Sequence, residues 1–521
     1  MLGIKLFPIN PKVDTPTKNK QGPNDDPEAA KPVQVNTGSN DETAPPVQPD
    51  LPQGSESEPQ ENPDAASVST EATDGTEAQA KSATAKKAPS KPTPAPEPEF
   101  EVPKDCDLAD YQGLSLAELY SRAMEARVRQ TAGRTKSQLI FDLLSLYSNR
   151  GTIIRAEGIL DVMPDGFGFL RWPLLNFRSG SDDVYVSPTL IRKHSLRTGQ
   201  FLKVSVRAPK NREKYLTVDE IFEIDDQPSE SYESPRGFDS LTALFPSERI
   251  ILENPDSESP TPRVIDIVAP LGKGQRALIA APPRGGKTLM LKDIACSIHR
   301  NHPEVELMIL LIDERPEEVT DFEETVDALV ISSTFDERPQ RHAQVAELVI
   351  ERAKRLVETG KDVVILLDSI TRLSRGYNAV QGGRGGTMSG GLGSNALNKP
   401  RKFFGSARNC EEGGSLTIVA TALIETESRM DEVIFEEFKG TGNMEVMLDR
   451  EMVEKRIFPA IQFAQSGTRK DDLLYHPDEM QGINTLRKQM AQLPVGEAME
   501  TLIKNIRSTS SNVELILRGL K

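Results

Sequence analysis

Eight residues in the second half of the chain have the composition of a phosphate-binding loop, Ala281-Pro282-Pro283-Arg284-Gly285-Gly286-Lys287-Thr288. An apolar run, 275–280, precedes them, and a segment with helical spacing, 289–294, follows. Small residues at such a turn let consecutive backbone N–H groups face phosphate oxygens at a helix N-terminus. Lys287 is then placed to reach the β- and γ-phosphates, and Thr288 to offer its hydroxyl to Mg²⁺. The pattern predicts a nucleotide-binding enzyme. It departs from the general motif in opening with Ala instead of Gly, and a glycine-rich turn that binds nothing is the alternative.

Two acidic residues at the ends of apolar runs complete this prediction. Asp368 follows the run 363–367 and is placed to hold the water shell of Mg²⁺ opposite Thr288. Glu314 ends a neighbouring run and is the better candidate to orient and polarise the attacking water. Either acid could instead be a helix cap.

Two arginines far downstream, Arg456 and Arg469, are candidates for an arginine finger. Such a residue acts in the site of a neighbouring subunit, so this interpretation predicts an oligomer. A glycine-dense segment, 382–393, is interpreted as a mobile loop that moves with a ligand, with a flexible surface linker as the alternative.

A second candidate site lies earlier in the chain, in Asp165-Gly166-Phe167-Gly168-Phe169-Leu170-Arg171. Phe167 and Phe169 alternate, so they share one face of a strand and could stack the bases of a single-stranded nucleic acid, while Arg171 supplies charge. Ordinary half-buried packing explains such aromatic residues equally well. The further polar and aromatic residues Asp183, Tyr185 and Glu213 follow, and a carboxylate such as Glu213 can accept a hydrogen bond from a cytosine amino group.

These residues must be positioned by elements of three kinds. Residues 114–148 have helical spacing, 151–225 contain five short β-type runs that suit a small barrel, and the chain from about 265 alternates apolar strands with helices. The last pattern is typical of a parallel sheet covered on both faces. We predict a multidomain protein with an α/β ATPase domain, divided as a disordered segment (1–104), a helical subdomain (105–150), a barrel (151–226), a linker (227–264) and a motor domain (265–521).

Composition narrows the class of protein further. The chain has 521 residues and a net charge of −16, which argues against indiscriminate nucleic-acid binding by the whole surface. Its first hundred residues are rich in Pro, Ser, Asp and Glu with few aromatic residues, so they cannot bury enough surface to fold. The three cysteines match no metal or disulfide spacing, and no signal or membrane-spanning run is visible. We expect a cytoplasmic protein with no membrane partner.

Taken together, the motifs are similar to those of the Rho-type transcription termination factors, hexameric RNA-translocating ATPases of bacteria, over roughly residues 110–519. Besides the two segments above, the resemblance rests on Val184-Tyr185-Val186-Ser187-Pro188, 311–320, 366–372, 437–443 and 466–470.

This resemblance implies a cold-shock-like (OB-type) barrel that captures cytosine-rich single-stranded RNA, and a RecA-like motor that closes into a six-membered ring and releases transcripts from RNA polymerase. It implies ATP and Mg²⁺ as cofactors. The primary RNA site would comprise Phe167, Phe169, Arg171, Asp183, Tyr185 and Glu213. The nucleotide site would comprise Arg284, Gly285, Gly286, Lys287, Thr288, Leu289, Arg315 as γ-phosphate sensor and Phe458 stacked on adenine.

The same resemblance implies that Glu314 activates water, Asp368 supports the metal, and Arg456 and Arg469 act from the adjacent subunit. Two channel loops would pull RNA, one containing Thr387 and Met388 and one ending at Arg429. The first loop has Gly386 near a position that is commonly basic in the family, which weakens the prediction of its grip on RNA. A rotary ATPase subunit and a non-catalytic RNA-binding protein are the competing classes.

Overall fold

In a computed structural model, the described part of the chain has separate hydrophobic cores in its N-terminal and motor regions. It comprises residues 102–128, 131, 133–210, 213–254, 257–381 and 389–520. The N-terminal core joins the first helices to a barrel, and the motor domain has its own buried hydrophobic residues. Most of the segment predicted to be disordered, and most of the first predicted channel loop, lie outside the described residues.

The N-terminal helices pack on the barrel. They are α1 (Leu108–Gly113), α2 (Leu116–Glu125) and α3 (Lys136–Asn149). α2 and α3 each begin with a capping box, in which Ser115 and Glu118, and Thr135 and Gln138, satisfy each other's backbone N–H groups. A short strand, β1 (Asp105–Asp107), pairs with the first barrel strand. The helices and the barrel therefore share a single core.

Five strands close into the predicted barrel. They are β2 (Ile153–Val162), β3 (Gly168–Arg171), β4 (Val184–Val186), β5 (Phe201–Arg207) and β6 (Leu216–Ile224). The order is β2-β3-β4-β6-β5, and β5 pairs back with β2. A short helix, α4 (Pro188–Lys193), follows β4. The register places Phe169 opposite both Asp161 and Tyr185, which brings the predicted aromatic residues together.

The segment after the barrel is packed along its course. It contains β7 (Gln227–Pro228), β8 (Ala243–Leu244) and β9 (Arg249–Ile250), and β9 pairs with β10 (Leu271–Gly272). Phe238, Ile250 and Leu252 are buried. The next helix, α5 (Thr261–Val268), spans the domain boundary predicted at 265. The predicted linker is therefore held against the motor domain.

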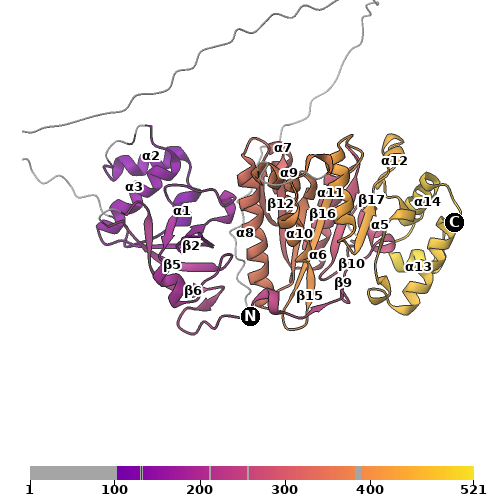
Figure 1. Cartoon of the computed structure of the whole chain (residues 1–521), viewed down its shortest axis with the longest axis horizontal. Helices are drawn as coiled ribbons and strands as arrows, with labels where there is room; N and C mark the ends of the chain where they lie inside the picture. Colours follow the sequence, from indigo (N-terminus) through magenta and orange to yellow (C-terminus); the bar gives the residue numbers. More distant parts are fainter. Residues whose placement is uncertain are drawn as a thin grey trace, which may run out of the picture. The chain divides into compact units, whose positions relative to one another are not determined.

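The motor domain is built on one large, mostly parallel sheet (Figure 1). Its strands, in spatial order, are β13 (Leu329–Thr334), β12 (Glu306–Glu314), β14 (Val363–Asp368), β16 (Ser415–Leu423), β11 (Arg276–Ala281), β17 (Met444–Met447) and β18 (Gly467–Thr468). β15 (Arg408–Cys410) joins β16 to β8. The apolar runs 275–280 and 363–367 of the sequence analysis correspond to the central strands β11 and β14. The sequence analysis missed the flanking strands β13 and β17.

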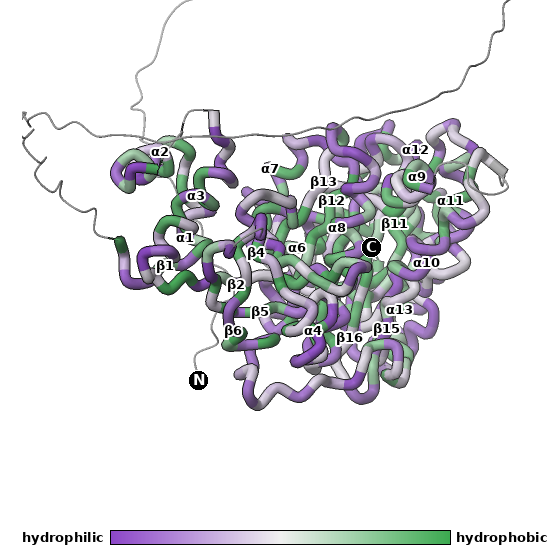
Figure 2. Tube along the Cα trace, turned by 60° about the vertical axis from the view of Figure 1, so that its left-hand side comes forward, coloured by the Kyte–Doolittle hydropathy of each residue, from purple (hydrophilic) through white to green (hydrophobic). Residues whose placement is uncertain are grey.

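Helices cover both faces of this sheet. Every residue of β14 is buried, and because successive side chains of a strand point to opposite faces, neither face is open to solvent. The hydropathy tube in Figure 2 is correspondingly green along β11, β12 and β16. The helices are α6 (Lys287–Asn301), α7 (Pro316–Thr325), α8 (Pro339–Glu358), α9 (Ile370–Gln381), α10 (Asn398–Gly405), α11 (Arg429–Lys439), α12 (Arg450–Glu454), α13 (Pro477–Met490), α14 (Val495–Arg507) and α15 (Asn512–Arg518). Among the residues that the structure describes, no helix is long and apolar enough to span a membrane.

Candidate functional site

The phosphate-binding loop forms the turn between β11 and α6, as its sequence predicts. Gly286 precedes the first residue of α6 with φ 83°, a left-handed conformation that favours glycine. A Cβ at Gly285 would lie 2.9 Å from the carbonyl oxygen of Pro282, too close for any side chain. The two glycines are therefore required by the path of the backbone, which delivers Lys287 and Thr288 to the start of the helix.

Lys287 joins the ends of two sheet strands. Its Nζ donates to Oε1 of Glu314 at 2.8 Å and to Oδ1 and Oδ2 of Asp368 at 2.7 and 2.6 Å. Glu314 ends β12 and Asp368 ends β14, and their side chains are 2% and 1% exposed. Because neighbouring parallel strands end at the same edge of a sheet, three residues distant in sequence meet at one point.

This cluster shifts the pKa values of its members. Burial raises the pKa of Glu314, the neighbouring Asp368 raises it further, and Lys287 opposes both. Burial lowers the pKa of Lys287, but Asp368 and Glu314 together raise it above its usual value. Lys287 is therefore charged, and Glu314 takes up a proton more readily than an exposed glutamate.

Two residues that the sequence analysis did not assign to the site orient its carboxylates. Thr421 of β16 donates its hydroxyl to Oδ1 of Asp368 at 2.7 Å. Arg372 of α9 lies 3.4 Å from Oε2 of Glu314. Arg372 stands one helical turn after Asp368, and this spacing was the available signal. Thr421 lies in a strand whose sequence gave no signal of a polar role.

Phe458 lies beside the phosphate-binding loop. Its ring comes within 3.7 Å of the position that a Cβ on Gly286 would occupy, and the side chain is 40% exposed. The remaining predicted nucleotide residues with long side chains are also exposed: Arg284 in the loop, Leu289 in the first turn of α6, and Arg315 between β12 and α7. The partly exposed phenyl ring of Phe458, next to the loop, offers a flat surface to a base.

The predicted trans-acting arginines do not join this cluster. Arg456 and Arg469 are exposed, and neither side chain forms an ion pair with another described residue. Arg456 lies in the turn after α12, and Arg469 directly follows β18 at the edge of the sheet. Within one chain, neither arginine belongs to the cluster formed by Lys287, Glu314 and Asp368.

The two predicted channel loops are described in part. Gly386, Thr387 and Met388 lie outside the described residues. Arg429 is exposed at the first position of α11, and a Cβ on Gly390 would lie 2.9 Å from its carbonyl oxygen. The end of the first loop segment therefore contacts the start of α11, where the second loop ends.

The barrel carries a cluster of aromatic side chains. The ring centroids of Phe167 and Phe169 are 5.7 Å apart, and the ring of Tyr185 lies 5.6 Å from Phe167 and 6.0 Å from Phe169. All three are half-buried. Tyr215, which the sequence analysis did not assign to the site, has its ring 5.0 Å from Phe169. Its position directly after a basic loop was the only sequence signal.

Arg171 is buried under this cluster. It is 5% exposed, its guanidinium carbon lies 5.1 Å from the ring centroid of Phe169, and it forms ion pairs with Asp161 and Asp183. Burial raises the pKa of Asp183, against the opposing effects of Arg171 and of the Gly180 N–H. The positive charge of Arg171, which was predicted to face RNA, is therefore largely balanced by two carboxylates. Hydrogen-bond donors to a base must come from the edge of this ion-pair network.

Glu213 lies at the rim of the barrel. Its carboxylate accepts two hydrogen bonds from Arg207, at 2.8 and 3.0 Å, and one from the backbone N–H of Lys210 at 2.7 Å. These bonds lower its pKa to about 2. Glu213 is therefore an ionised hydrogen-bond acceptor at neutral pH.

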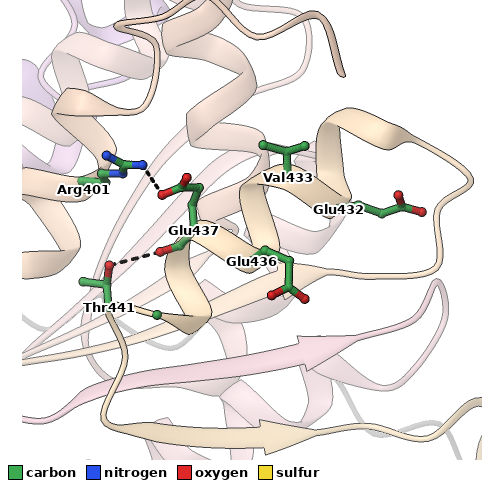
Figure 3. Close-up of a pocket in the computed structure, with 7 residues that line it drawn as sticks. Arg401, Glu432, Val433, Glu436, Glu437 and Thr441 are labelled. Carbon is green, nitrogen blue, oxygen red and sulfur yellow. Dashed lines mark hydrogen bonds and ion pairs between the residues drawn. The ribbon is translucent and has the colours of Figure 1, made fainter. Parts of the chain in front are cut away.

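A hollow elsewhere on the motor domain carries a different arrangement (Figure 3). It lies on α10 and α11, and Glu437 stands there between Arg401 and Thr441. The lining residues are Arg401, Glu432, Val433, Glu436, Glu437, Gly440 and Thr441. The sequence motif 437–443 ends at Asn443, whose Oδ1 accepts from the N–H of Arg276 at 2.8 Å. This motif therefore anchors the start of β11, and none of the predicted nucleotide residues lines the hollow.

A phosphate-binding loop facing two buried acids, in one chain with a barrel that presents clustered rings, defines a nucleic-acid-binding P-loop ATPase. Residues 156–230 match the RNA-binding domain of the Rho termination factor, and residues 262–468 match the nucleotide-binding domain of the ATP synthase alpha/beta family.

The chain is 55% identical over 420 residues to the transcription termination factor Rho of Akkermansia muciniphila, covering 81% of this chain and 88% of that one. It is 50% identical to Rho of Cereibacter sphaeroides (78% and 97% covered) and 51% identical to Rho of Chromobacterium violaceum (78% and 97%). The chain belongs to the Rho family. It is an RNA-binding, ATP-hydrolysing transcription termination factor. Among solved structures, an ATPase of the type III secretion system of pathogenic bacteria aligns with a TM-score of 0.46 at 20% identity, covering 60% of this chain and 92% of that one.

Proposed function

We propose that this protein binds cytosine-rich single-stranded RNA with its barrel and moves along it as a homohexameric ring, driven by ATP hydrolysis, to release transcripts from RNA polymerase in the cytoplasm. The observation that carries the proposal is the contact of Lys287 with both Glu314 and Asp368, in the same chain as the aromatic barrel face. An intact catalytic cluster weighs against a non-catalytic RNA-binding protein, and the aromatic face against a rotary ATPase subunit.

In the nucleotide site, the loop N–H groups, Gly285, Gly286 and Lys287 bind the phosphates. Lys287 leaves its two carboxylates to do so, which frees Glu314 to accept a hydrogen bond from the attacking water. Arg284, Leu289 and Arg315 line the bound nucleotide, and Arg315 contacts the γ-phosphate. Phe458 stacks on the base. Arg372 and Thr421 hold the two carboxylates in place during the exchange.

The donor set also fits Mg²⁺. Thr288 offers a hydroxyl and Asp368 a carboxylate, and Mg²⁺ in such sites keeps several waters and needs few protein ligands. Among the described residues there is no cluster of three or more His, Cys, Asp or Glu side chains that would form a complete protein cage, which agrees with a metal carried in with the nucleotide. When bound, the ion offsets charge on the β- and γ-phosphates.

The remaining negative charge of the nucleotide phosphates is balanced by arginines from a second copy of the chain. Arg456 and Arg469 are exposed and stand apart from Lys287 in one chain, and in the ring they reach the nucleotide of the adjacent subunit. The site is complete only at a subunit interface.

On RNA, the rings of Phe167, Phe169 and Tyr185 stack bases, Arg171 and Asp183 form the polar floor, and Glu213 accepts from a cytosine amino group. Thr387, Met388 and Arg429 contact the strand in the channel. We infer that the chain is divided into a disordered segment (1–104), a helical subdomain (105–150), a barrel (151–226), a linker (227–264) and a motor domain (265–521).

The test is ATP turnover by the full-length protein without RNA, with poly(C) and with poly(A), at one stated salt concentration because phosphate contacts are salt-dependent. Strong stimulation by poly(C) alone is the expected result. Turnover independent of RNA would point to another kind of RecA-like ATPase, and no turnover under any condition to a degenerate site.

A further inference from the structure

α8 connects the barrel to the motor sheet (Figure 1). Residues near both ends of α8, Arg341 at the start and Arg352 and Glu358 in the second half, contact the barrel region, and the helix also packs on α9 and on β12, β14 and β16. The barrel therefore contacts an element of the motor core directly, in addition to the connecting segment.

The first contact surrounds Arg352. Its guanidinium is about nine-tenths buried and donates to the side chain of Asp225, at the end of β6, and to the carbonyl of Gly199 at 3.3 Å. A Cβ on Gly199 would lie 2.4 Å from the backbone of Glu351, and the φ of Gly199 is +92°. Only glycine permits this approach, so the backbone of a barrel turn lies directly on the helix.

The second contact surrounds Glu358, whose side chain is fully buried. It accepts two hydrogen bonds from Arg197 of the barrel, at 3.1 and 2.7 Å, and one from the backbone N–H of Phe238 at 2.6 Å. Arg355 lies 2.9 Å from the same carboxylate. A buried carboxylate with four such donors holds one geometry, because breaking any part of the network leaves a charge unpaired.

The third contact lies at the edge strand of the motor sheet. The loop that continues from β3 contains Asn176, whose Oδ1 accepts from the N–H of Ser332 in β13 at 2.6 Å. Arg341 of α8 donates to the carbonyls of Asn176 and Phe177. The strand that carries Phe169 and Arg171 thus leads within a few residues to β13, which pairs with β12 up to Glu314.

We propose that these three contacts, centred on Arg352, Glu358 and Asn176, form a clamp that fixes the aromatic face relative to the motor, so that one RNA held by the barrel is presented to the motor at high effective concentration. These residues are positioning residues, and the inference rests on the proposed function. A rigid mount confines the free end of the bound RNA, whereas a loosely tethered barrel lets it sample a larger volume.

The clamp makes a specific distinction between RNAs. A short oligocytidine that occupies only the barrel gains nothing from the mount. A long poly(C) that reaches both the barrel and the motor gains the full effective-concentration advantage. Loss of the clamp should therefore act on the long RNA alone.

The experiment uses the full-length double variant Arg352→Gln/Asp225→Asn, which removes both charges together, and the separate variant Asn176→Gly. Both Asp225 and Asn176 have positive φ, which Asn and Gly tolerate, so neither substitution strains the backbone. The matched control is Glu347→Gln, which neutralises an α8 side chain that contacts Tyr377 and Lys399 of the motor.

Three quantities are measured for each protein: the Kd for short oligocytidine, the poly(C) concentration that gives half-maximal ATP turnover, and the maximal rate. For the double variant we expect the half-maximal poly(C) concentration to rise at least about tenfold, with the other two quantities within about twofold of wild type. Asn176→Gly should shift it in the same direction, and Glu347→Gln should not.

An unchanged half-maximal concentration in both clamp variants would overturn the clamp, and so would a parallel rise in the Kd for short oligocytidine, because the damage would then lie in the barrel. A wild-type protein whose turnover does not respond to poly(C) would instead contradict the proposed function, and the clamp with it.

Discussion

The motor site and the barrel face use charge in opposite ways. In the motor, the ammonium of Lys287 and the carboxylates of Glu314 and Asp368 are buried and contact each other directly. In the barrel, the charged pair of Arg171 and Asp183 lies underneath, and half-buried rings form the face above it. The first arrangement suits a reaction, in which preorganised charge must meet developing charge. The second suits binding of a flexible strand through stacking, which tolerates any base.

The largest effect is expected when the central positive charge of the motor site, Lys287, is removed. We expect Lys287→Ala to lower kcat for ATP at least about 1,000-fold, because it removes a phosphate ligand and leaves two buried carboxylates without their cation. Binding of oligocytidine should stay within a few fold of wild type. Lys292→Ala, which removes another buried lysine of α6, is the control. Loss of RNA binding in Lys287→Ala alone would show that the two sites are not separate.

A second change tests the role of the catalytic acid. Glu314→Gln should lower kcat about 100-fold with nucleotide affinity nearly retained, because the amide cannot take a proton from water. Burial raises the pKa of Glu314, and a base works only when ionised. Wild-type turnover should therefore fall, as the pH is lowered, at a higher pH than an ordinary glutamate would give. A pH profile of kcat for the variant that keeps this decline would assign the base elsewhere.

The barrel face is tested by removing two of its rings. Phe167→Ala with Tyr185→Ala should weaken binding of oligocytidine about 10- to 100-fold, since each stacked base is worth about 1–3 kcal/mol. ATP turnover at saturating poly(C) should stay near wild type. Phe222→Ala removes a barrel ring that is 41% exposed and outside the cluster, and serves as control. If a direct binding titration showed that the double variant and Phe222→Ala lose the same oligocytidine affinity, the aromatic cluster would not be the RNA-binding face.

The smallest effect is expected at the exposed ion pair of the barrel. Contacts with Arg207 and Lys210 lower the pKa of Glu213 from 4.5 to about 2, so its stabilising contribution is present above pH 4.5 and is lost as the pH falls toward 2. Solvent screening keeps that contribution below about 1 kcal/mol. Denaturant unfolding of Glu213→Gln at pH 7 should therefore differ little from wild type, and the difference should shrink below pH 4.5. A loss of several kcal/mol would mean that Glu213 supports the fold.

The sequence predicted the contacts of the motor site better than those of the barrel site, for a physical reason. Glycines, Lys287 and the acids at strand ends are dictated by local backbone geometry and by the rule that parallel strands end at one edge. Thr421 and Tyr215 joined their sites through strand pairing, which no local pattern encodes. Arg171 was expected to supply charge, but its burial between Asp161 and Asp183 depends on the barrel register. The edge strand β13 was missed because its sequence offers a short run beside a charged segment.

β13 also has a consequence for how this chain behaves in isolation. It pairs only with β12 among the described strands, so its other side is an open edge of the kind that recruits strands from other molecules. The loop after β3 covers part of that edge through Asn176. The barrel thus protects the motor domain from aggregation as well as binding RNA. A motor domain produced without the barrel would expose β13, which could pair with β13 of another molecule.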